Sequence, residues 1–188
     1  AAALGIAACM QLLNVSWRVG TGLDEARALL EEGQALANAI ADRRAHLSLS
    51  MVYGRARCGG GDVAEYLEVA FEARRAALAL DDVGMQANAC FYLVDALSLA
   101  TRLPEALPLA EEGLARFPRH IPSAEWVMGL NPYSCFVLWR GTCLSWMGRL
   151  SEGLEDLIRT RRLVEEDGTP ELAGCALFFA AEAYRHAH

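Results

Sequence analysis

The sequence predicts an all-α fold, built as a solenoid of helical hairpins that stack on one another. Three observations support this prediction. A short motif recurs along the chain, helix-forming apolar runs alternate with short breaks, and sustained alternation of polar and apolar residues is missing. A hydrophobic content of 54% over 188 residues excludes a disordered chain and suffices to bury a core. We therefore expect a single repeat domain rather than two large domains.

The recurring motif opens the second helix of each predicted hairpin. Its copies are Leu23-Asp24-Glu25-Ala26, Val63-Ala64-Glu65-Tyr66, Leu103-Pro104-Glu105-Ala106 and Leu150-Ser151-Glu152-Gly153. The glutamates are 40, 40 and 47 residues apart, and an amphipathic run follows each copy. Acidic side chains in the first turn of a helix favour its positive end by about 0.3–1 kcal/mol each. We therefore interpret these acids as structural rather than catalytic.

A further helix is predicted before each copy of the motif. These first helices span about residues 4–18, 44–57, 84–100 and 132–147, and a fifth begins near residue 171. The repeats are then 1–41, 42–81, 82–119, 120–168 and a partial 169–188. One hairpin cannot bury its apolar face alone, so the core forms between stacked hairpins. Because the chain starts without Met and stops within a helical pattern, we expect it to be a fragment of a longer protein.

Two local features leave alternatives open. Pro108 falls where a helix interior is expected, so the helix around it either begins late or bends. The extra seven residues of the last spacing fall in 118–132. They form a longer loop, an extra helical turn whose Trp126 covers the core, or a flap over a groove.

The hairpin resembles a tetratricopeptide repeat. That repeat has a small residue in the middle of its first helix, another at its end, and an alanine early in its second helix. The fourth unit matches at Gly141 and Gly148 and has Gly153 at the alanine position. The second unit matches at Gly54 but has Tyr66 at the alanine position. The resemblance implies an α-α superhelix of about four and a half hairpins, each longer than the usual repeat of about 34 residues.

Long, degenerate repeats of this kind resemble the helical regions of large bacterial signalling proteins. There they follow an ATPase domain in LuxR- and MalT-type regulators, or accompany a class III adenylate/guanylate cyclase domain. The stretch from Asn131 to Leu154 resembles the cyclase-linked group. The resemblance implies a cytoplasmic, non-catalytic module that regulates the parent protein by binding a protein or peptide segment, including the parent's own catalytic domain. The alternatives are a small-molecule sensor with its effector in the concave groove, and a homodimerisation module.

In tetratricopeptide repeats the first helix of each pair lines the concave face, which implies a set of binding residues here. Such a groove needs apolar area for affinity and polar groups for orientation. The candidates are Gln11, Val15, Arg18, Met51, Arg55, Asn88, Phe91, Asp95, Leu138, Thr142 and Ser145. A shift in helical register would instead place Phe91 or Leu138 in the core.

Composition and motifs argue against several other functions. A net charge of −7 disfavours nucleic acid as a partner, and the uncharged stretch 1–17 is shorter than the roughly 20 apolar residues of a membrane span. The six cysteines form no CxxC pair, which is typical of free thiols in a reducing cytoplasm. Gly59-Gly60-Gly61 is followed by no Lys-Ser/Thr pair, so it is not a phosphate loop. We expect no enzymatic activity, no metal and no cofactor.

Overall fold

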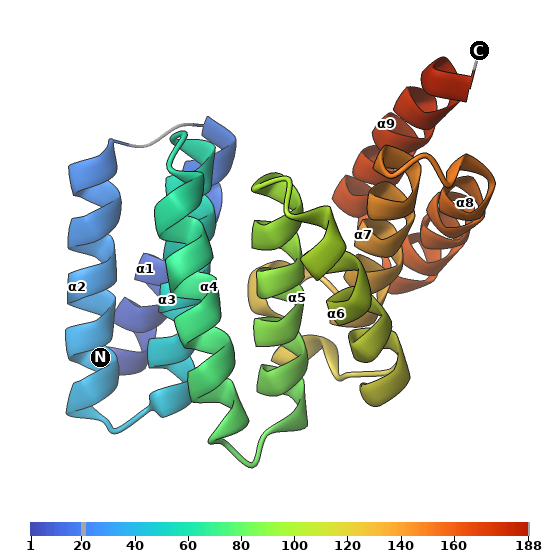
Figure 1. Ribbon diagram of the computed structural model, residues 1–188. Helices are drawn as coiled ribbons and strands as arrows, with labels where there is room; N and C mark the ends of the chain where they lie inside the picture. The colour runs from blue at the N-terminus through green and yellow to red at the C-terminus, as the bar shows by residue number, and fades with distance from the viewer. Residues whose placement is uncertain (20–21, 188) are drawn as a thin grey trace. The chain divides into compact units, whose positions relative to one another are not determined.

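The computed structural model describes residues 1–19 and 22–187, and the side chains of residues 1–16 and 22–185. Over these residues the fold is all-α, without a β-strand, and the helices pack in chain order (Figure 1). The predicted fold class is therefore confirmed. The chain divides into two compact units, which we call unit 1 (Ala1–Ala89) and unit 2 (Cys90–His188) and describe separately.

Unit 1 consists of two helical hairpins and the beginning of a further helix. Its helices are α1 (Ala2–Val19), α2 (Leu23–Ala39), α3 (Arg43–Gly59), α4 (Val63–Leu78) and the first part of α5 (Val83–Leu99). The α3 helix packs against α1, α2 and α4, and α1 also packs against α2. Figure 1 shows α3 flanked by α2 and α4. The core of unit 1 therefore surrounds α3.

The starts of α3, α4 and α5 are set by aspartates that the repeat motif did not reveal. The side chains of Asp42, Asp62 and Asp82 each accept a hydrogen bond from the backbone N–H three residues later, at 2.8 to 3.0 Å. These bonds satisfy amide groups that have no partner within the helix. Gly61, just before Asp62, has a φ of +95°, which a side chain would strain.

Unit 2 continues the same arrangement. After the rest of α5 it contains α6 (Leu103–Arg116), the 3₁₀ turns η1 (Ser123–Glu125) and η2 (Val127–Gly129), α7 (Pro132–Trp146), α8 (Leu150–Asp167) and α9 (Pro170–Ala187). The α7 helix packs against α6, α8 and α9, and α8 packs against α9. The second helices thus begin at the four motif positions, as predicted.

Small residues allow close helix contacts in both units. A Cβ atom added to Gly141 would lie 2.9 Å from the Gly153 carbonyl oxygen, so α7 and α8 approach through their backbones. In unit 1, a Cβ added to Gly54 would lie 2.9 Å from the ring of Tyr66. The large Tyr66 side chain at the predicted alanine position is therefore accommodated by a glycine on the facing helix.

The structure decides between the alternatives for Pro108. The α6 helix begins at Leu103 and continues through Pro108 to Arg116, so a late start is wrong. Pro104 occupies the first turn, where a missing N–H is tolerated. Pro108 has no N–H for the carbonyl of Pro104, and the helix continues with this one bond missing.

Residues 118–132 form a longer loop with two 3₁₀ turns rather than an extra turn of α-helix. The indole Nε1 of Trp126 donates to the Ile121 carbonyl at 2.8 Å, which closes the loop on itself. The Asn131 side chain donates to Asp167 Oδ1 at 3.1 Å, at the end of α8. The loop is thereby attached to the α7–α8 hairpin.

Candidate functional site

Most of the binding residues predicted on the first helices are buried. Gln11 and Val15 are exposed on α1, Arg55 is half-buried, and the side chain of Arg18 lies outside the described residues. The remaining seven, at 0 to 9% exposure, are Met51, Asn88, Phe91, Asp95, Leu138, Thr142 and Ser145. At these seven positions the exposure that a groove lining requires is not found, so their part in binding stays a prediction.

The packing of α3 and α7 explains the burial of Met51 on α3 and of Leu138, Thr142 and Ser145 on α7. Each of these first helices contacts three other helices, so the face that the resemblance assigned to a groove is covered. The polar groups at these positions bond within their own helix. The hydroxyls of Thr142 and Ser145 donate to the carbonyls four residues earlier, both at 2.9 Å. Such groups are satisfied in the core without a ligand.

A groove is instead found in unit 1, between the second helices α2 and α4, with α3 as its floor. It consists of two adjoining hollows of about 310 and 280 Å³ that share His46, Leu47 and Ala76. We call it the α2–α4 groove. Its lining comprises Leu30, Gln34 and Asn38 from α2, Arg43, His46, Leu47, Ser50 and Tyr53 from α3, and Val69, Glu72, Ala73, Ala76 and Leu80 from α4 and the turn after it.

Polar groups in the floor of the α2–α4 groove are held in place by a short chain of hydrogen bonds. Gln34 Nε2 donates to Ser50 Oγ at 2.9 Å, and Ser50 Oγ donates to the His46 carbonyl at 3.2 Å. The imidazole Nδ1 of His46 is buried and has no hydrogen-bond partner among the residues that the structure describes. A buried polar atom without a partner is unusual in a folded protein and is often found where a ligand or water binds.

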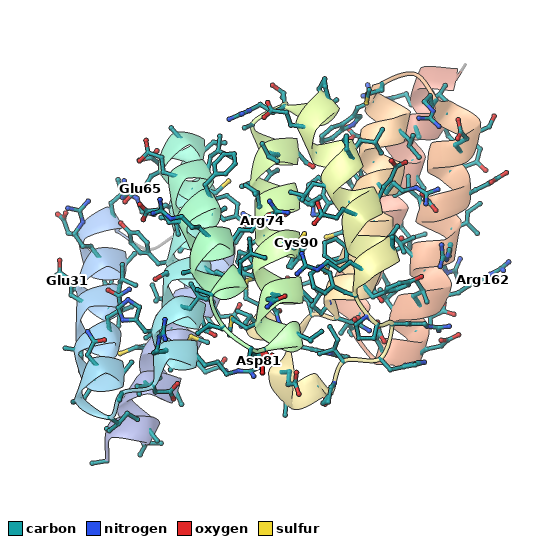
Figure 2. The ribbon with its side chains drawn as sticks, turned by 60° about the horizontal axis from the view of Figure 1, so that its bottom comes forward. Glu31, Glu65, Arg74, Asp81, Cys90 and Arg162 are labelled. Carbon is teal, nitrogen blue, oxygen red and sulfur yellow. The ribbon has the colours of Figure 1, made fainter. Side chains whose placement is uncertain are left out.

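A charged network between α3 and α4 adjoins the groove at Tyr53. Tyr53 donates to Glu65 Oε1 at 2.7 Å, and Arg57 donates to both Glu65 and Asp62. Figure 2 shows Glu65 at the beginning of α4. Burial and the neighbouring Glu65 carboxylate raise the pKa of Tyr53, whereas the Glu65 amide and Arg57 lower the pKa of Asp62. The network is internally paired, so we interpret it as a structural connection of α3 to α4.

Two further motif acids, Glu105 and Glu152, also have structural partners. Glu105 and Glu152 each form two hydrogen bonds with an arginine three residues earlier, Arg102 and Arg149. These bonds lower the pKa of both glutamates, and the pairs lie on the surface. Pairing with an arginine on the surface agrees with a structural rather than a catalytic role for Glu105 and Glu152.

Asp156 is the buried carboxylate that most resembles an active-site acid. It is 5% exposed between α7 and α8, and burial raises its pKa from the ordinary 3.8 despite Arg140, whose Nε lies 2.9 Å from its Oδ2. The two atoms are close but not aligned for a hydrogen bond. A Cβ on the facing Gly141 would lie 2.9 Å from Asp156 Cβ, so the helices leave no room for a substrate there. Asp156 is a buried structural charge.

The raised pKa of Asp156 predicts a specific pH dependence. The folded state binds this proton more tightly than the unfolded chain, so Asp156 favours folding below its ordinary pKa, and this contribution is lost as pH rises through the folded-state value. We expect Asp156→Asn to be more stable than the wild type near about pH 7, with the difference vanishing below about pH 4. Urea unfolding at several pH values measures this. A variant less stable than the wild type at neutral pH would show that attraction to Arg140 outweighs burial.

Cysteines and other ligand-type side chains show no reactive arrangement in the described chain. The cysteines are free thiols, and burial raises the pKa of Cys9, Cys135 and Cys143. A buried thiol with a raised pKa is a poor nucleophile. Three or more His, Cys, Asp or Glu side chains do not gather anywhere among the described residues. None of the helices described here has the length and apolar character that crossing a membrane requires.

Comparison with known proteins adds no family to this description. No family model matches the chain, and no curated protein matches it. The resemblance pointed to first helices, whereas the α2–α4 groove combines the second helices α2 and α4 with other residues of α3. One signal was present in the sequence: Gln34 and Asn38 are carboxamides one helical turn apart on α2.

Proposed function

We propose that this chain is a non-catalytic helical-repeat module that binds a peptide segment of a partner protein. The observation that carries the proposal is the α2–α4 groove, which has apolar side chains beside fixed polar ones. Peptide grooves combine these two features, because apolar area supplies affinity and polar groups supply orientation. A tetratricopeptide-like module of this kind fits a bacterial signalling protein, where binding would bias the parent between inactive and active arrangements.

The length of the groove favours a peptide over a small effector. From Leu30 to Asn38 the α2 wall rises by about 12 Å, and from Arg43 to Tyr53 the floor rises by about 15 Å. A small effector is usually enclosed over most of its surface, whereas an extended segment needs only a long channel between helices. The two hollows adjoin along the lining residues that they share, which favours such a channel.

Filling the groove should abolish peptide binding. Ala76 is exposed and lines both hollows, so Ala76→Trp places a large ring in the channel. Peptides selected from a displayed random library on the wild-type chain should bind this variant at least about tenfold more weakly, as measured by fluorescence anisotropy. The matched control is Ala35→Trp, at an exposed position of α2 outside the lining, which should bind as the wild type does.

Two results would contradict the proposed function. One is that no peptide family is enriched on the wild-type chain. The other is that the enriched peptides bind Ala76→Trp as tightly as they bind Ala35→Trp. Circular dichroism of both variants establishes that the helices are retained, so that a loss of affinity reports on the groove.

A further inference from the structure

We infer that the α2–α4 groove takes an extended peptide of about four residues, held with its acidic side chain beside Arg43 and its basic side chain beside Glu72. This inference rests on the proposed peptide-binding function and adds the conformation, the charge pattern and the direction of the ligand. It follows from the spacing of polar groups on α2, the small side chains of α4 and the charges of the groove.

The α2 wall presents groups suited to an extended backbone. Gln34 and Asn38 are four residues apart and both line the groove, so they are separated by about 6 Å along the helix. Alternate residues of an extended strand are separated by about 6.6 Å. Each carboxamide has both donors and an acceptor, as a peptide group does. The two side chains therefore match the backbone groups of alternate residues in an extended ligand.

The opposite wall leaves room for the ligand's side chains. Ala73 and Ala76 line the groove from α4, and their methyl groups fill little of it. The buried Nδ1 of His46 lies in the same floor without a partner, and in the neutral ring with its proton on Nε2 it is an acceptor. A ligand could place an apolar side chain in the space beside the two alanines. One of its backbone N–H groups could donate to Nδ1 of His46.

Charges at two levels of the groove give the ligand a direction. Arg43 is exposed at the end where α3 begins, and its neighbour Arg44 is paired with Asp82 at 2.8 Å. Glu72 has a side chain that is 76% exposed, and its Oε1 lies 3.8 Å from the exposed Arg75, a contact of little energy. The groove is thus cationic at one level and anionic at another, which favours a ligand with complementary charges.

The height difference between these charges sets the spacing in the ligand. The α3 and α4 helices are antiparallel, and Gly54 lies against Tyr66, so Glu72 is level with Ser48. Arg43 is five residues from Ser48, which corresponds to about 7.5 Å along α3. Two residues of extended peptide cover about 6.6 Å. We therefore expect an acidic and a basic residue with one residue between them, on the same side of the strand.

Charge reversal tests the direction of the ligand. The probes are peptides selected from a displayed random library on the wild-type chain, which should be enriched in an acidic and a basic residue at this spacing. At low ionic strength Arg43→Glu and Glu72→Arg should each weaken binding at least about tenfold. Exchanging the acidic residue of the peptide for lysine should restore affinity for Arg43→Glu, and exchanging the basic residue for glutamate should restore it for Glu72→Arg.

Two variants with the same change of charge serve as controls. Glu31→Arg lies on the outer side of α2 and Arg162→Glu on α8, both at exposed positions labelled in Figure 2 and outside the groove lining. The charge pattern would be overturned if peptides bind Ala76→Trp more weakly but bind the two groove variants no more weakly than these controls. The proposed function would then still stand. Peptides that bind Ala76→Trp normally, or no enriched peptides, would overturn both.

Discussion

Replacing Tyr66 with alanine should lower the free energy of unfolding of unit 1 by about 3–5 kcal/mol, as expected for deletion of a fully buried aromatic ring. Tyr66 is 0% exposed and is among the largest side chains with no solvent contact. Its ring occupies the space between α3 and α4 that the absent side chain of Gly54 leaves open. Removing the ring leaves a cavity that the two helices close only in part.

The exposed Phe71 on the same helix provides the matched control. Its side chain is 43% exposed, so Phe71→Ala should cost about 1 kcal/mol or less. Both variants are measured by urea unfolding followed by far-ultraviolet circular dichroism. Equal losses for Tyr66→Ala and Phe71→Ala would show that Tyr66 does not fill a core position.

A double-mutant cycle then tests whether Gly54 and Tyr66 depend on each other. In the wild type, Gly54→Ala places a methyl group 2.9 Å from the Tyr66 ring and 3.1 Å from Val69, which should cost about 1–3 kcal/mol. With Tyr66 already replaced by alanine, the same change should be neutral or stabilising by about 0.5–1 kcal/mol, because alanine favours helix. Additive effects would contradict this dependence.

This pair shows why the fold could be predicted while one of its contacts could not. The motif starts at Leu23, Val63, Leu103 and Leu150 coincide with helix starts because breaks and amphipathic periods are local properties of the chain. The match of Tyr66 with Gly54 joins residues on two helices. Helical periodicity shows that each position faces inward, but it does not show which large residue a glycine accommodates.

The α2–α4 groove could not be predicted from the sequence for a related reason. The resemblance assigned the groove to first-helix residues such as Met51 and Leu138, and the structure buries both. Exposure depends on how many neighbours a helix has, and α3 and α7 each have three. The α2–α4 groove requires residues from three helices, so its existence depends on packing rather than on any one helix. The polarity of Gln34 and Asn38 was visible in the sequence, but their common channel was not.

The second large loss of stability is expected from Gly153→Ala, at the contact between α7 and α8 in unit 2. An added Cβ would lie 2.2 Å from Ser145 Oγ, 2.7 Å from the Gly141 carbonyl oxygen and 2.8 Å from the Ser145 nitrogen. Two of these atoms belong to the backbone, so α7 and α8 must separate. Overpacking of this kind costs about 1–3 kcal/mol or more, and the helix preference of alanine returns about 0.5–1 kcal/mol. We expect a net loss of about 2 kcal/mol.

Gly174→Ala should change the free energy of unfolding in the opposite direction. Comparing the two substitutions therefore tests the packing of α7 against α8. Gly174 lies within α9, and among the described residues no atom beyond its chain neighbours and its own helix backbone lies within 4 Å of its ideal Cβ position, so alanine should stabilise unit 2 by about 0.5–1 kcal/mol. Trp139 and Trp146 belong to unit 2, and their fluorescence reports its unfolding in urea. If both substitutions stabilised the protein, α7 and α8 would have to lie farther apart than their backbones do in this structure. Opposite signs would show that Gly153 is required by the close approach of the two helices, because intrinsic helix preference acts alike at both glycines.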